Sequence, residues 1–229
     1  MKNYKNYIKL VLIVLLFLFS SIFKLIPILF FKIKPGTPFN DSLISLMGNS
    51  VVCFLLCILY RDTLINDFKK FKNNPLSFVE IGIKYWFIGL SIMVFSNAII
   101  SMILGGAIAT NEENVRGLLR NSPIITLLIT SITAPIIEEL VFRKTFRDAF
   151  SNKWVFVLSS GIIFGSLHVL LVLHSLGELL YLIPYCSLGI AFSYMYYKSD
   201  NIYTSIFVHM LHNSILSILS LISLGVILW

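Results

Sequence analysis

The chain has 229 residues, of which 57% are hydrophobic and 13% are charged, with a net charge of +7 and a mean hydropathy of +0.88. A soluble domain keeps about a quarter of its residues charged, so this composition excludes a water-soluble globular protein. The cations lie in short segments between apolar blocks. The basic balance therefore does not indicate nucleic-acid binding, and membrane lipids are the expected surroundings.

Seven apolar blocks approach or exceed the length of a membrane-spanning helix, which takes about 20 residues, whereas barrel strands need about 10. The sequence predicts an all-α, polytopic transmembrane helix bundle of about seven to eight spans, because the third and seventh blocks are long enough to break. The blocks cover residues 10–31, 43–60, 79–106, 124–142, 155–173, 176–197 and 202–228.

The distribution of Lys and Arg predicts a multi-pass protein of the cell membrane with a cytoplasmic N-terminus. The basic start before the first block, with no small-residue cleavage site after it, is typical of a signal-anchor that stays in the protein. With this orientation, the inner side holds Lys2, Lys5, Lys9, Arg61, Lys69, Lys70, Lys72, Arg143, Lys144, Arg147, Lys153 and Lys198, and the outer side holds Lys32, Lys34, Arg116 and Arg120.

Two polar segments join these blocks. Residues 61–77 could form either an interfacial helix on anionic lipid or a solvated loop. Residues 111–121 are expected to be an outer loop of mixed charge. Polar residues that are unusual for a membrane span lie in the second half of the chain, so residues 1–121 are interpreted as an N-terminal transmembrane scaffold and residues 122–229 as the functional core of one integral membrane unit.

The first unusual group is the pair Glu138 and Glu139, followed by Arg143. Ionised side chains inside a span cost about 2.5–3.5 kcal/mol on the mildest scale, so they usually have a function. On a helix, Glu139 and Arg143 share a face and can form an ion pair, whereas Glu138 points about 100° away and has no evident local cation. Glu138 is thus a candidate proton acceptor for water. The alternative is a helix end at which both carboxylates reach water.

Histidines supply the other two groups. His168 follows Gly165 and Ser166, which permit close helix approach, and a hydrogen-bonded structural role is the simpler interpretation of a lone histidine. Ser205, His209 and Asn213 recur every four residues and form one polar stripe on a helix. The stripe could join helices, or its imidazole and amide N–H groups could stabilise a developing oxyanion.

The sequence places Glu138 and His168 at different depths in the membrane, although a shared site needs them at the same depth. Glu138 lies about 5 residues from the basic inner segment and His168 about 15 residues from Lys153, a mismatch of about 15 Å at 1.5 Å per residue. Either the fourth helix continues past Arg143 or residues 145–157 enter the membrane as a tilted or re-entrant segment. The second arrangement is preferred, because irregular backbone is tolerated where protein surrounds it.

Glu-Glu-x-x-x-Arg at 138–143, Phe-x-x-x-His at 164–168 and His-x-x-x-Asn at 209–213 resemble the motifs of the CPBP family. This family contains CaaX prenyl endopeptidases and bacteriocin-processing and immunity proteins. The resemblance covers residues 122–225 and implies a helical membrane protease, with residues 122–229 as its core and a site that opens towards the cytosol.

The resemblance implies a role for each motif residue. Glu138 corresponds to the general base and His168 to its partner in activating water, while His209 and Asn213 correspond to the oxyanion-stabilising pair. Glu139 and Arg143 occupy supporting positions. His212 matches no motif position. Zinc or another divalent metal is an open alternative, with Glu138, His168 and His209 as its ligands and one position left open; direct activation of water without a metal is the other.

The leading hypothesis is an intramembrane endopeptidase that hydrolyses a peptide bond in a membrane-associated protein or a peptide precursor. One alternative is a non-enzymatic membrane protein of the bacteriocin self-immunity or interaction type. A proton-coupled transporter is a further alternative, which the unequal spans without inverted repeats disfavour. The sequence specifies neither the substrate, nor whether it is prenylated, nor the oligomeric state.

Overall fold

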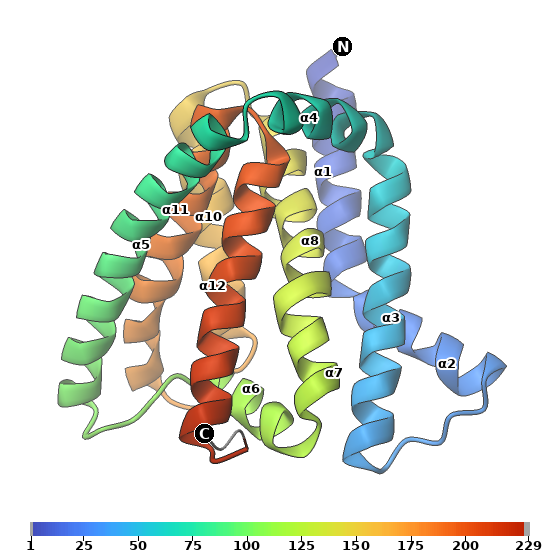
Figure 1. Cartoon of the computed structure of the whole chain (residues 1–229), viewed down its shortest axis with the longest axis vertical. Helices are drawn as coiled ribbons and strands as arrows, with labels where there is room; N and C mark the ends of the chain where they lie inside the picture. Colours follow the sequence, from blue (N-terminus) through green and yellow to red (C-terminus); the bar gives the residue numbers. More distant parts are fainter. Residues whose placement is uncertain (1, 227–229) are drawn as a thin grey trace.

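The computed structural model describes residues 2–226, and the end of the seventh apolar block lies outside this range. All regular elements in the described residues are helices, and they pack side by side as a bundle (Figure 1). Six helices are long and apolar enough to cross a membrane, and a bent pair, Tyr4–Leu18 with Ser20–Phe30, provides a seventh span if counted as one. The predicted polytopic helix bundle is confirmed. One helix, Pro75–Ile103, covers most of the third block, and another, Ile202–Ser223, covers most of the described part of the seventh.

The first half of the chain supplies α1 (Lys2–Leu18), η1 (Ser20–Lys24), α2 (Leu25–Phe30), α3 (Pro38–Leu59), α4 (Arg61–Asn73), α5 (Pro75–Ile103) and α6 (Thr110–Asn121). Helices α3 and α5 begin at proline, which lacks the N–H that a first turn leaves unpaired. Helix α5 turns large apolar side chains outward, including Phe87 and Phe95. Such an exterior suits lipid and not water.

The second half supplies α7 (Pro123–Leu128), η2 (Ile129–Thr133), α8 (Ala134–Glu138), η3 (Glu139–Thr145), α9 (Phe146–Ala149), α10 (Lys153–Leu170), η4 (Leu176–Tyr181), α11 (Leu182–Ser199) and α12 (Ile202–Ser223). An asparagine before each of α10 and α12 accepts a hydrogen bond from the first-turn backbone, at Asn152 and Asn201. These caps fix where the two histidine-bearing helices begin.

The fourth apolar block is longer than its sequence indicated. Residues from Pro123 to Ala149 form one span, in which η2 and η3 are π-helical turns on either side of Glu138. Arg143 is fully buried inside this span and does not mark its end. The preferred re-entrant segment at 145–157 is therefore wrong, and the alternative, a fourth helix that continues past Arg143, is correct.

This extension largely removes the mismatch in depth. The span ends at Ala149, 11 residues beyond Glu138, which corresponds to about 16 Å of helix. His168 lies 15 residues beyond the start of α10 at Lys153, or about 22 Å. A tilt of the helices relative to each other can account for the remaining difference of about 6 Å in depth.

Glycines let α10 and α11 approach closely. A Cβ atom added to Gly161 would lie 2.5 Å from the backbone nitrogen of Ile190, and one added to Gly165 would lie 2.5 Å from that of Cys186. On α11, Gly189 meets the carbonyl oxygen of Gly161 in the same way, at 2.5 Å. The contact needs hydrogen in place of a side chain at these positions, and it fixes the position of His168 one turn further along α10.

Helices α4 and α6 lie at opposite ends of the bundle (Figure 1). Residues 61–77, for which a helix and a loop were both open, contain α4 across one end, where Asp67 accepts a hydrogen bond from the backbone N–H of Ile202 at 3.0 Å. Residues 111–121 are helix α6 and not the expected loop. Its polar ends and the ion pair between Arg116 and Glu112, 2.9 Å apart, stabilise a short helix that has few apolar residues to reveal it.

Candidate active site

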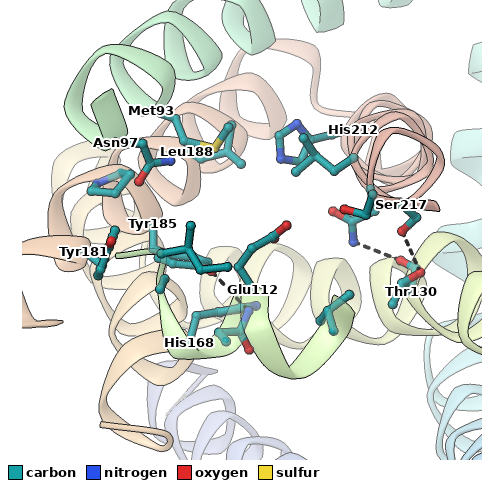
Figure 2. Close-up of a pocket in the computed structure, with 18 of the residues that line it drawn as sticks. Met93, Asn97, Glu112, Thr130, His168, Tyr181, Tyr185, Leu188, His212 and Ser217 are labelled. Atoms are coloured by element: carbon teal, nitrogen blue, oxygen red, sulfur yellow. Dashed lines mark hydrogen bonds between the residues drawn. The ribbon is translucent and has the colours of Figure 1, made fainter. Parts of the chain in front are cut away.

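A cavity of about 580 Å³ lies between α5, α6, α10, α11, α12 and the Pro123–Ala149 span. Among the residues that line it are Glu138, His168, His209, His212 and Asn213. Figure 2 shows His168 and His212 on opposite sides of this cavity. Three of the motif segments therefore meet around one space that can hold a peptide segment and water.

The two adjacent glutamates have different surroundings, as their helical spacing indicated. Glu138 lines the cavity, and its side chain is 14% exposed. Glu139 is completely buried on the other side and faces Arg143, with Oε2 at 3.3 Å from Nε. The predicted ion pair is present, and the carboxylate that faces the cavity is Glu138.

Aromatic rings surround the buried guanidinium. The Cζ atom of Arg143 lies 4.3 Å from the centroid of the Phe164 ring and 5.7 Å from that of Phe192. Aromatic faces attract a cation when water is excluded. The ion pair and these rings together hold Arg143, so that Glu139 keeps a cation beside it and stays ionised.

His209 connects the two glutamates. Its Nδ1 lies 2.8 Å from Oε1 of Glu139, and its Nε2 lies 3.6 Å from Oε2 of Glu138. An ionised carboxylate only accepts hydrogen bonds, so Nδ1 carries a hydrogen and donates it to Glu139. The other nitrogen is then directed at Glu138, at a distance slightly longer than a hydrogen bond.

The orientation of His168 is set by its own helix. Nδ1 lies 2.9 Å from the carbonyl oxygen of Phe164, four residues earlier. A carbonyl oxygen cannot donate, so Nδ1 carries the hydrogen and the neutral ring keeps its lone pair on Nε2. The ring lies between those of Phe164 and Tyr185, with centroids 4.5 Å and 5.4 Å away. His168 can therefore accept a hydrogen bond from a water molecule in the cavity.

Asn213 continues the polar stripe of α12. Its Nδ2 donates one hydrogen bond to the carbonyl oxygen of Thr130 at 2.9 Å, and Figure 2 draws Thr130 with its second partner, Ser217. Thr130 belongs to the π-helical turn η2, whose backbone hydrogen bonds join residues five apart instead of four. An amide nitrogen has two hydrogens, so Asn213 keeps one for a ligand. Ser205, the first member of the stripe, is buried and bonds its own helix, to Ile202.

Comparison with known proteins finds matches over the segment that carries these residues. Residues 120–215 match the family described as "Type II CAAX prenyl endopeptidase Rce1-like", and this segment contains all three motifs. This likeness supports a membrane protease of the CPBP family.

Two relatives extend the comparison. The chain is 28% identical over 228 residues to the "Putative membrane peptidase YdiL" of Bacillus subtilis (strain 168), covering 95% of this chain and 90% of the relative. It is 29% identical over 121 residues to the "UPF0177 protein YxdF" of Lactococcus lactis, covering 52% of this chain and 61% of the relative. No solved structure matches the chain significantly.

The family is often associated with a metal, and the donor set can be compared with that chemistry. Among residues 2–226, no three His, Cys, Asp or Glu side chains are arranged around a common point at which they could hold one ion. The residues considered as zinc ligands, Glu138, His168 and His209, all belong to the site. Their arrangement among the described residues does not form a three-ligand centre.

Sequence reasoning missed part of the site. His212 was left without a role, and it lines the cavity with its Nδ1 at 3.2 Å from Nε1 of Trp86. Trp86 lies on α5, which also contributes Met93 and Asn97 to the wall, outside the part of the chain that carries the CPBP motifs. Trp86 and His212 are 126 positions apart in the sequence, so no local sequence pattern indicates their contact.

The cavity extends from Glu138 towards the end of the bundle where α6 lies, since Asn111, Glu112 and Arg116 of α6 line it. The basic segments, including α4, lie at the other end (Figure 1). Helix α6, which lines the cavity, and the basic segments that the sequence assigns to the inner side thus lie at opposite ends of the bundle.

Proposed function

We propose that this protein is a CPBP-type endopeptidase of the cell membrane that hydrolyses a peptide bond with water activated by Glu138 and His168. The observation that carries the proposal is that three helices direct Glu138, His168, His209 and Asn213 into one cavity. Such groups cost free energy in a membrane unless they are paired or used.

In the proposed reaction, a water molecule donates one hydrogen bond to Glu138 and one to Nε2 of His168. Its oxygen attacks the carbonyl carbon of the peptide as Glu138 takes its proton. The carbonyl oxygen becomes negatively charged and accepts hydrogen bonds from Asn213 and from Nε2–H of His209. His209 has taken that proton from Glu138 before the water binds and keeps it through the reaction, so Glu138 is ionised when it accepts the proton of water. Glu138 then returns the proton to the departing amine as the C–N bond breaks.

The supporting residues keep these groups in position. Arg143 neutralises Glu139, and Glu139 accepts from Nδ1 of His209, so the reactive nitrogen of His209 is turned towards Glu138. Removing either charged partner leaves the other buried and unpaired. Glu139 and Arg143 are thus positioning residues and do not contact the peptide.

We also propose a cytoplasmic N-terminus, which makes the cavity accessible from the outer side of the membrane. The substrate is then a membrane-associated protein or peptide precursor whose cleavage site reaches the outer half of the bilayer.

The test compares peptide termini in membranes that contain either the wild-type protein or Glu138→Gln, with and without a chelator. We expect a set of new termini that requires wild-type protein and persists with the chelator. Identical termini in both membranes would overturn the protease proposal. Loss of the set upon chelation would replace direct activation of water by a metal-dependent reaction.

A further inference from the structure

His212 is a third histidine in the cavity that the three motifs do not include. It lies on α12 one turn beyond His209, at a spacing that places two side chains on the same face of a helix with Cβ atoms about 5–6 Å apart. Its side chain is buried at 4% exposure and lines the cavity. The ring of Phe192 packs against both histidines, with centroids 5.0 Å from His209 and 6.3 Å from His212.

Trp86 fixes which nitrogen of His212 carries the hydrogen. An indole N–H can only donate, and Nε1 of Trp86 lies 3.2 Å from Nδ1 of His212. Nδ1 must therefore be the acceptor. The neutral ring then carries its hydrogen on Nε2, the nitrogen on the far side from Trp86.

This state differs from those of the other two histidines. In His168 and His209, Nδ1 donates, to Phe164 and Glu139, so that a neutral ring has a lone pair on Nε2. His212 has the opposite tautomer. It is thus the one histidine of the three that offers an N–H from Nε2 while neutral, and it needs no proton from Glu138 to do so.

We infer that the Nε2–H of His212 donates a hydrogen bond to the carbonyl oxygen of the scissile peptide bond, together with the free amide hydrogen of Asn213. The inference rests on the proposed protease function and adds a catalytic residue to it. Trp86 is then a positioning residue, supplied by α5 from outside the segment that matches the Rce1-like family. The donor acts on the charge that develops on oxygen, so its effect falls on kcat.

Two conservative substitutions separate this role from a structural one. In His212→Gln, the side-chain amide nitrogen can take the place of Nε2 and still donate to the substrate. In His212→Asn, the shorter amide reaches only the place of Nδ1, where its oxygen can still accept from Trp86. The pair therefore has similar polarity and differs in whether a donor reaches the scissile carbonyl.

The experiment first defines the peptide termini that disappear from membranes when Glu138→Gln replaces wild-type protein. An empty set would overturn the protease function and this inference with it. For a non-empty set, we expect His212→Asn to lose the same termini and His212→Gln to retain them. Retention of all termini by His212→Asn would overturn the role of His212 alone.

Kinetics on a peptide spanning one such cleavage site complete the test. With purified full-length protein in liposomes, His212→Asn should lower kcat about 100-fold with KM nearly unchanged, as for loss of one oxyanion donor. His212→Gln should recover most of this loss, and Trp86→Phe should lower kcat by a smaller factor because the tautomer is no longer fixed. A higher KM at unchanged kcat would contradict the inference, since it would place His212 on a flanking carbonyl group.

Discussion

His209 donates from Nδ1 to Oε1 of Glu139 across 2.8 Å while its Nε2 faces Glu138 at 3.6 Å. Two neighbouring carboxylates in the sequence thus have different tasks because a helix turns them onto different faces. Glu139 is buried and orients the imidazole, whereas Glu138 reaches the cavity. Their substitution should consequently affect the protein in different ways.

Glu138→Gln should abolish cleavage and leave the fold intact. The amide has the shape of the carboxyl group but cannot take a proton from water, and general-base catalysis contributes about 100- to 10,000-fold. Cleavage of a membrane-derived substrate peptide and thermal unfolding in detergent provide the two measurements. Activity near the wild-type level would exclude Glu138 as the base, and a large fall in melting temperature would show a structural role.

Arg143→Met should destabilise the protein by about 3–5 kcal/mol, because it leaves Glu139 buried without a cation. Both side chains are fully buried in the native state. The double variant Glu139→Leu with Arg143→Met is the matched control. It should recover much of the stability in a detergent-unfolding assay and still lack activity, since His209 no longer has an acceptor for Nδ1. An active double variant would contradict the positioning role.

Gly165→Ala should reduce activity strongly, because its Cβ would lie 2.5 Å from the backbone of Cys186 and would push α10 from α11. His168, one turn away, would move with the helix. Gly117→Ala on α6 is the control, since a Cβ atom there meets nothing within 4 Å and alanine stabilises a helix by about 0.5–1 kcal/mol relative to glycine. Equal activities of the two variants would show that the close α10–α11 contact does not position the site.

Cysteine labelling in intact cells can determine the side of the membrane on which the cavity opens. In a background with Cys53, Cys57 and Cys186 replaced by serine, a membrane-impermeant maleimide should label Gly117→Cys on α6 and should not label Lys70→Cys on α4. Permeabilised cells provide the control, in which both positions react. The reverse pattern in intact cells would place the basic end outside and restore a cytosolic opening.

Much of the site could be predicted because helical spacing carries geometric information. The four-residue interval between Glu139 and Arg143 predicted their ion pair, and the 100° step predicted that Glu138 would point elsewhere. The length of the fourth span could not be read in this way. A charged residue such as Arg143 indicates the membrane surface on average, and only its enclosure by Glu139, Phe164 and Phe192 lets it lie within the span.

Contacts between distant segments explain the other differences. Helix α6 has a low apolar content, and its contacts with the cavity depend on the end of α5 and the start of α11, which lie near it. The tautomer of His212 depends on Trp86, which lies on another helix. Periodicity along one helix contains no information about such partners.

The most direct test of the central claim is hydrolysis in water enriched in oxygen-18 by purified protein in liposomes. The substrate is a peptide whose cleavage in membranes requires Glu138. Wild-type protein should produce a new C-terminal carboxylate that contains one heavy oxygen, with the rate unchanged by chelator, and Glu138→Gln should produce almost none. Equal rates for the two proteins would contradict activation of water by Glu138.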